Sequence, residues 1–233
     1  MSKEAIVLAG GLGTRLKHLL DDLPKPMAPI GNQPFLTYLL LCLENEGVER
    51  VILSVGYMSE KIIGHYGYNF NSLEIVYSVE DVPLGTGGAI KKSLSLCQEE
   101  YVFVVNGDTY FDISFDIMRK AFLIKKPALL IALCKMNSFD RYGTVEVNDE
   151  GIVMSFKEKS FKESGLINGG IYLLKTDLML EADLTERFSF EIDIMEKQVS
   201  SGGIMAIPFD NYFIDIGVPE DFYKAQKELP SYL

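Results

Sequence analysis

The sequence predicts a single α/β domain built on a mostly parallel sheet with helices on both faces. Short apolar runs alternate with helix-like patterns through its first half, which is typical of strands joined by crossover helices. The chain has 233 residues, 48% of them hydrophobic, which suits one domain with a well-filled core. No linker rich in proline, glycine or serine divides the chain, and it has no internal repeat. We therefore expect one domain over residues 1–233.

The first strand is expected at Glu4–Ala9, where the apolar run Ala5-Ile6-Val7-Leu8 stops at a glycine-rich turn. Similar runs predict four more strands, at Arg50–Val55, Leu73–Ser78, Tyr101–Asn106 and Ala128–Leu133. Helical patterns fill the intervals, at Pro34–Glu46, Ser59–Tyr66, Gly87–Leu96 and Phe115–Lys125. In such sheets ligands bind where parallel strands end, so we expect the binding residues at that edge.

From about Tyr142 onward, shorter strands and turns replace this alternation. The expected strands are Gly143–Val147, Gly151–Lys157, Ile167–Leu174 and Gly203–Pro208, and a last helix is expected at Pro219–Lys227. We interpret this part as a second ligand-binding subregion on the same sheet.

The turn after the first strand has the features of a phosphate-binding loop. It contains Leu8-Ala9-Gly10-Gly11-Leu12-Gly13-Thr14-Arg15-Leu16. The glycines at 10, 11 and 13 allow positive φ and let backbone N–H groups approach an anion, and arginine adds a planar, permanent charge. The spacing differs from the dinucleotide-binding G-x-G-x-x-G and the Walker G-x-x-x-x-G-K-[ST] motifs. The alternative is a turn that needs glycine only to join a strand to a helix.

A single lysine lies between two prolines shortly after this loop, in Leu23-Pro24-Lys25-Pro26-Met27. Each proline fixes its own φ and favours an extended conformation at the residue before it. We therefore expect Lys25 on a stiff, non-helical stretch that holds its charge in a defined position.

Together, the glycine-rich loop and the Pro24-Lys25-Pro26 segment closely resemble the signature of the sugar-1-phosphate nucleotidyltransferases, or nucleotide-sugar pyrophosphorylases. Further segments look like later motifs of this family, in the family's order: Leu84-Gly85-Thr86-Gly87-Gly88-Ala89, Asn106-Gly107-Asp108-Thr109, Glu158-Lys159, Asn168-Gly169-Gly170-Ile171-Tyr172 and Phe213-Ile214-Asp215-Ile216-Gly217-Val218-Pro219-Glu220-Asp221. The resemblance implies a Rossmann-like mixed sheet of the nucleotide-diphospho-sugar transferase type. It also implies a catalytic domain over 1–233, with a nucleotide-binding part at about 1–141 and a sugar-binding part at about 142–233.

The reaction implied by the resemblance is attack of a sugar 1-phosphate oxygen on the α-phosphorus of a nucleoside triphosphate, which releases pyrophosphate. The matching motifs assign Arg15 and Lys25 as catalytic cations, and Asp108 and Asp215 as ligands of Mg²⁺, which prefers carboxylate oxygens. Nucleotide-binding residues are expected at Leu8, Ala9, Gly10, Gly11, Gly13, Thr14, Glu80, Gly85 and Thr86, and sugar-binding residues at Gly143, Glu158, Lys159 and Asn168. The alternatives are that Gly107-Asp108 is a turn and that Asp215 is an acid in the N-cap region before the Pro219–Lys227 helix. Lys157-Glu158-Lys159 would then be a solvated, charged strand end.

The choice of base depends on Glu80, in the loop after the third expected strand. Relatives that transfer uridylyl or thymidylyl groups often have glutamine near this position, whereas a carboxylate only accepts hydrogen bonds. Guanine presents two adjacent donors, N1–H and N2–H₂, which favours GTP. The whole pattern is most similar to the guanylyltransferases of D-glycero-D-manno-heptose 1-phosphate, which serve surface polysaccharide synthesis. One alternative is a UTP- or dTTP-dependent hexose or muramate 1-phosphate nucleotidyltransferase. Another is a non-catalytic nucleotide-sugar-binding domain, which the complete catalytic set argues against.

The formal charge of −11 argues against nucleic acid or an anionic membrane as a partner, because both require a basic surface. Cys42, Cys97 and Cys134 are far apart and suggest neither a disulfide framework nor a zinc cluster. The N-terminal residues lack the pattern of a secretory leader and no apolar run has membrane-spanning length, so we expect a cytoplasmic protein. The histidines, His18 and His65, are expected to be structural. The sequence leaves a homo-oligomeric state open.

Overall fold

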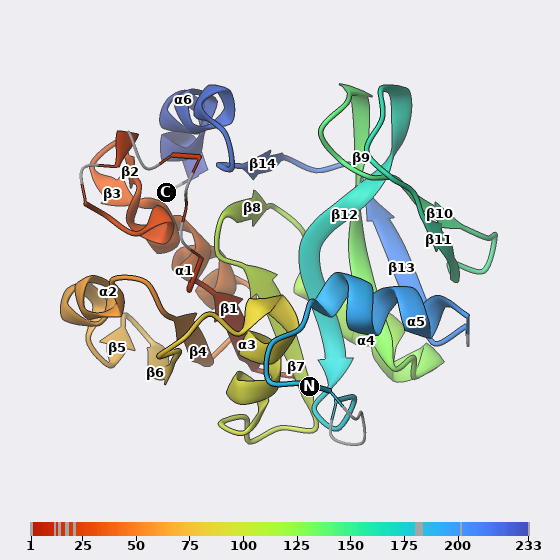
Figure 1. The fold of residues 1–233 in the computed structure, drawn as a ribbon, viewed down its shortest axis with the longest axis horizontal. Helices are drawn as coiled ribbons and strands as arrows, with labels where there is room; N and C mark the ends of the chain where they lie inside the picture. The colour runs from red at the N-terminus through yellow and green to blue at the C-terminus, as the bar shows by residue number, and fades with distance from the viewer. Residues whose placement is uncertain are drawn as a thin grey trace.

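An eight-stranded mixed sheet runs through the centre of the molecule (Figure 1). The computed structural model describes residues 2–11, 13, 15–16, 19–20, 22–179, 184–200 and 202–232. In spatial order, the strands are β13 (Ile204–Phe209), β9 (Leu129–Phe139), β12 (Lys162–Lys175), β7 (Tyr101–Asn106), β1 (Glu4–Leu8), β4 (Arg50–Val55), β6 (Leu73–Val79) and β5 (Asn69–Phe70). Neighbouring strands are parallel from β7 through β1 and β4 to β6, and β13 is parallel to β9. The strand β12 lies antiparallel between β7 and β9. This arrangement confirms the predicted fold class.

Helices cover both faces because alternate residues of the central strands point to opposite faces and both sets are apolar. On one face, Ala5 and Val7 belong to a core that includes residues of α1 (Phe35–Asn45), α2 (Ser59–Tyr66), α4 (Phe115–Lys125) and α6 (Pro219–Glu228). On the other face, Ile6 and Ile52 pack with α3 (Gly85–Leu94) and with a π-helix at Phe190–Met195 that continues as α5 (Glu196–Val199). Figure 1 shows α3 and α5 in front of the sheet. Among the described helices, none combines the length and hydrophobicity needed to cross a bilayer.

Three two-stranded ladders lie beside the main sheet. They are β2 (Pro29–Ile30) with β3 (Gln33–Pro34), β8 (Thr109–Phe111) with β14 (Phe213–Asp215), and β10 (Val145–Val147) with β11 (Val153–Phe156). The β8–β14 pair is important for the site because Asp215 lies opposite Thr109 in its register. In addition, the backbone N–H of Ile216 donates to the carbonyl oxygen of Asp108 at 2.9 Å. Two segments far apart in sequence therefore meet at the end of β7.

Most expected elements are confirmed with small shifts at their ends. The strand β9 continues past the expected end at Leu133, because it remains paired with β12 as far as Phe139 and Lys162. The helix α3 begins at Gly85 instead of Gly87. The expectation of a non-helical stretch at Lys25 is wrong: Lys25–Met27 form one 3₁₀ turn, which a proline can join at its start, and only Pro24 before it is extended. The three cysteines are free.

Candidate active site

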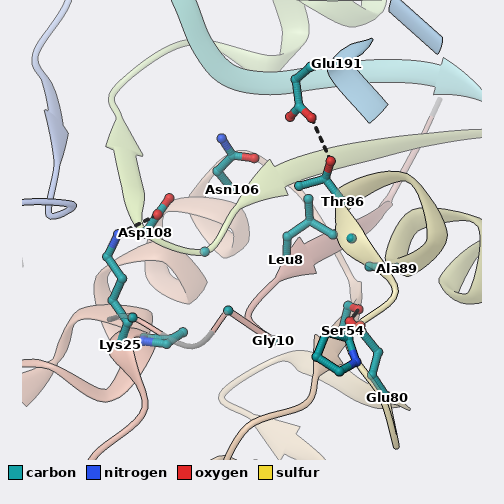
Figure 2. A pocket seen from close by; sticks show the side chains of 16 residues that line it. Leu8, Gly10, Lys25, Ser54, Glu80, Thr86, Ala89, Asn106, Asp108 and Glu191 are labelled. Atoms are coloured by element: carbon teal, nitrogen blue, oxygen red, sulfur yellow. Dashed lines mark hydrogen bonds and ion pairs between the residues drawn. The ribbon is translucent and has the colours of Figure 1, made fainter. Parts of the chain in front are cut away.

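Seven of the nine expected nucleotide-binding residues converge at the carboxyl ends of β1, β4, β6 and β7, where they line a cavity of about 490 Å³. Leu8, Gly10, Gly11, Gly13, Lys25, Glu80, Gly85, Thr86 and Asp108 all belong to its lining. Figure 2 shows three polar corners of this cavity, formed by Ser54 with Glu80, Lys25 with Asp108, and Thr86 with Glu191. The cavity therefore offers separate polar groups to different parts of one ligand.

A second cavity of about 250 Å³ adjoins the first and shares Gly11, Gly13, Lys25 and Asp108 with it. The remaining expected cation and acid, Arg15 and Asp215, line this second cavity. Ala9 is buried in the core and is part of neither described lining. Thr14 and His18 lie outside the described residues.

Two of the three glycines in the loop after β1 are constrained, and for different reasons. Gly13 has a φ of +57°, and a Cβ there would lie 2.9 Å from the Cβ of Lys25. Positive φ was also expected at Gly10 and Gly11, and this is wrong. At Gly10 the constraint is space, since a Cβ would lie 2.9 Å from Oε1 of Glu80, and at Gly11 a Cβ would meet nothing within 4 Å.

At the second corner, one lysine lies against two carboxylates. The Nζ of Lys25 donates to Oδ2 of Asp108 at 2.6 Å and lies 4.0 Å from Oδ1 of Asp215. The backbone N–H of Gly217 donates to Oδ1 of Asp215 at 2.6 Å. Burial and then the charge of Asp108 hold the pKa of Asp215 above its usual range, against the opposing charge of Lys25. This place therefore stabilises additional positive charge.

The donors at this corner suit a hard divalent cation, because both side chains present carboxylate oxygens. No cluster of three or more His, Cys, Asp or Glu side chains occurs in the part of the chain that the structure describes. A metal ion bound by Asp108 and Asp215 would therefore need ligands from substrate phosphates or water.

The third corner contains a carboxylate that sequence reasoning missed. The hydroxyls of Thr86 and Ser189 donate to Oε2 of Glu191 at 2.7 and 2.9 Å, and the backbone N–H of Phe190 donates to Oγ1 of Thr86 at 2.9 Å. Glu191 lies in the π-helix, far along the chain from the other lining residues. No local motif marks it, and only the packing of this segment on α3 brings it to the cavity.

This packing depends on glycines at the start of α3. The backbone N–H of Gly87 donates to the carbonyl oxygen of Phe188 at 3.0 Å. In return, the N–H of Phe188 donates to the carbonyl oxygen of Leu84 at 3.1 Å. A Cβ at Gly85 or Gly87 would lie 2.5 or 2.2 Å from an atom of Phe188. At Gly88 it would lie 2.4 Å from the carbonyl oxygen of Glu186. The two segments can approach this closely only without side chains at these positions.

At the first corner, Glu80 is held on both oxygens. The hydroxyl of Ser54 donates to Oε1 at 3.1 Å, and the backbone N–H of Leu84 donates to Oε2 at 3.0 Å. Each oxygen has two lone pairs, so each can accept one further hydrogen bond from a ligand in the cavity.

The four residues expected to bind the sugar are absent from both described linings. Glu158 and Lys159 are exposed. Asn168 donates to the hydroxyl of Tyr172 at 2.8 Å and accepts from the N–H of Gly170 at 3.0 Å. A Cβ at Gly143 would lie 2.3 Å from the carbonyl oxygen of Lys157, so these backbones are in close contact. The sugar-binding role of these residues stays a prediction.

Comparison with known proteins finds relatives that match nearly the whole chain. The chain is 48% identical to the D-glycero-alpha-D-manno-heptose 1-phosphate guanylyltransferase of Campylobacter jejuni over 94% of this chain and 97% of that protein. It is 45% identical to the enzyme of the same name from Aneurinibacillus thermoaerophilus, over 99% and 100%. The structure of HddC from Yersinia pseudotuberculosis complexed with GMP-PN aligns with a TM-score of 0.87 and 37% identity, covering 97% and 99% of the two chains. The model of the family "Nucleotidyl transferase" matches residues 4–231, and this chain therefore belongs to the nucleotidyl transferase family.

Proposed function

We propose that this chain transfers a guanylyl group from GTP to D-glycero-D-manno-heptose 1-phosphate, forming a nucleotide sugar and pyrophosphate. Two enzymes named for this reaction match it over nearly the full length of both chains. HddC was solved with GMP-PN, a guanine nucleotide, which supports the choice of base. The nucleotide sugar would serve surface polysaccharide synthesis.

The observation that carries the proposal is the Glu80 carboxylate, fixed in the cavity by Ser54 and Leu84 with one lone pair free on each oxygen. Guanine offers two adjacent donors, N1–H and N2–H₂, which such a carboxylate can accept together. Uracil and thymine place a single N–H between two carbonyl oxygens. The negative carboxylate would repel these oxygens. The corner therefore favours GTP over UTP and dTTP.

The reaction needs no general base from the protein. The second pKa of a phosphate monoester is near ~6, so the sugar phosphate oxygen is largely ionised at neutral pH. It attacks the α-phosphorus, a new P–O bond forms, and the bond from the α-phosphorus to the bridging oxygen breaks with departure of pyrophosphate. Lys25 and Arg15, which line the adjoining cavities, would neutralise the charge that develops on the phosphates.

Asp108 and Asp215 would hold Mg²⁺, as the raised pKa of Asp215 beside Asp108 supports. Bound there, Mg²⁺ would supply positive charge to the phosphate oxygens. Lys25 would orient Asp108 through their hydrogen bond. Replacing Asp108 or Asp215 by Asn should lower turnover by orders of magnitude with folding intact, and EDTA should abolish parental activity.

For the sugar we propose Gly143, Glu158, Lys159 and Asn168, with residues of about 142–233 forming the sugar-binding part and those of about 1–141 the nucleotide-binding part. Glu191 would add a hydrogen-bond acceptor, because its Oε2 is held by two hydroxyls at the wall of the larger cavity. Sugar hydroxyls are selected by polar groups that a wrong stereoisomer would leave unpaired.

A matrix of GTP, ATP, UTP and dTTP against several sugar 1-phosphates, followed by pyrophosphate release, tests the proposal. The highest kcat/KM is expected for GTP with D-glycero-D-manno-heptose 1-phosphate. A preference for UTP or dTTP with every sugar phosphate would refute guanylyl transfer. A preference for GTP with another sugar phosphate would show that only the proposed sugar acceptor is wrong, and guanylyl transfer would stand.

A further inference from the structure

The first corner of the larger cavity contains a buried hydroxyl, that of Ser54, which donates a hydrogen bond to Glu80. Ser54 is the penultimate residue of β4, is 0% exposed, and donates to Oε1 of Glu80 at 3.1 Å. The second donor, the backbone N–H of Leu84, belongs to the residue just before α3 and reaches Oε2 at 3.0 Å. Two separate elements of the fold therefore hold the two oxygens of one carboxylate.

Space restricts the same carboxylate on a third side. A Cβ at Gly10 would lie only 2.9 Å from Oε1, so the backbone after β1 lies directly against this oxygen. A glutamate side chain has several rotamers in solution, and ordering it when a ligand binds would weaken affinity. Here the ordering is already accomplished before the nucleotide arrives.

We propose that Ser54 is a positioning residue for base selection: its hydroxyl, with the Leu84 amide, holds the Glu80 carboxylate in the one orientation that accepts both N–H donors of guanine. The inference rests on the proposed guanylyl transfer and adds a residue to it. Two simultaneous hydrogen bonds depend more strongly on orientation than one. Hypoxanthine keeps N1–H but lacks the N2 amino group, so ITP should depend less on Ser54 than GTP does.

The sheet itself offers a matched control. Ser78 lies opposite Ser54 in the register of β4 and β6, and it is 2% exposed where Ser54 is 0% exposed. Its hydroxyl has no hydrogen-bond partner among the described residues. Ser78→Ala therefore makes the same chemical change at the same depth without removing a bond to Glu80.

The test measures the dissociation constants of GTP and ITP by calorimetry for the parent, Ser54→Ala and Ser78→Ala, with kcat and KM for GTP. Ser54→Ala should weaken GTP binding about tenfold, as expected for loss of a hydrogen bond to a charged group, and ITP binding by less. The KM for GTP should rise in the same proportion, and kcat should change less. Ser78→Ala should bind both nucleotides as the parent does.

Equal affinities of Ser54→Ala and Ser78→Ala for each nucleotide would overturn the role of Ser54. Ser54→Cys keeps a similar side chain with a weaker donor, so it should show intermediate GTP affinity, and it decides the question if Ser54→Ala unfolds. A parent that binds GTP no more tightly than ITP, or a Glu80→Gln variant with an unchanged preference, refutes the two-donor contact between Glu80 and guanine. Guanylyl transfer itself is refuted only by a preference for UTP or dTTP. If Glu80→Gln loses the preference and Ser54→Ala keeps it, only the role of Ser54 fails.

Discussion

Gly13→Ala should lower both the stability of the protein and its kcat, because two independent constraints meet at this position. A φ of +57° costs an L-residue about 1–2 kcal/mol relative to glycine. The new Cβ would lie 2.9 Å from the Cβ of Lys25, which cannot move freely between Pro24 and Pro26. Alanine also restricts the unfolded chain, which would stabilise the protein by about 0.4–1 kcal/mol. Strain and contact together exceed this gain, so we expect a net loss of about 1–2 kcal/mol.

For a domain of this size such a loss lowers Tm by roughly 2–8 °C, which calorimetry resolves. Because a misplacement of ~1 Å at a reacting centre can cost ~100-fold, a smaller shift of Lys25 should lower kcat on the order of tenfold. Gly11→Ala is the matched control, since its Cβ meets nothing within 4 Å and its φ is not positive. Its Tm should lie about 1–4 °C above that of the parent, because alanine restricts the unfolded chain without strain at this position. Equal melting of both variants would refute the reasoning about Gly13.

Glu4→Gln should lower the free energy of unfolding by about 2–4 kcal/mol in urea titrations, because its buried carboxylate accepts from an arginine and from two backbone amides. Nucleotide affinity should be unchanged, and equal urea midpoints would contradict this assignment. Lys25→Met should raise the pKa of the Asp215 carboxyl further, because Lys25 lowers it against burial and the charge of Asp108. Carbon NMR titration without metal should show this carboxyl losing its charge at a higher pH than in the parent; an unmoved titration would contradict the contact. Thr86→Val should raise the KM for the sugar phosphate about fivefold, because Glu191 loses a hydroxyl donor, whereas Thr86→Ser should not.

The central sheet could be predicted from the sequence because its signals are local. Arg50–Val55 and Tyr101–Asn106 are short apolar runs with polar ends, and both strands have the expected bounds. The reasons behind single residues could not be predicted where they depend on distant segments. Gly10 is required by Glu80, which reaches it only when β1 and β6 are assembled around β4.

The family motifs predicted most of the residues that gather at the two cavities, but the four residues expected to bind the sugar lie in neither lining. Lys25, Asp108 and Asp215 do meet, because the β8–β14 ladder joins the ends of two strand segments. Glu191 was missed because no motif surrounds it in the sequence, and its partner Thr86 lies in another element. Lys25 was expected on extended backbone because rules for residues before proline disregard the helical turn that the surrounding core imposes.

The glycine contact between α3 and the segment before the π-helix limits how new specificities can arise by recombination. The start of α3, which lines the larger cavity, and the segment that leads to Glu191 fit together only while Gly85, Gly87 and Gly88 lack side chains. A chimera that exchanges one half of the chain for that of a relative inherits only one side of this contact. Such an exchange therefore requires that the parent supplying α3 has glycine at all three positions.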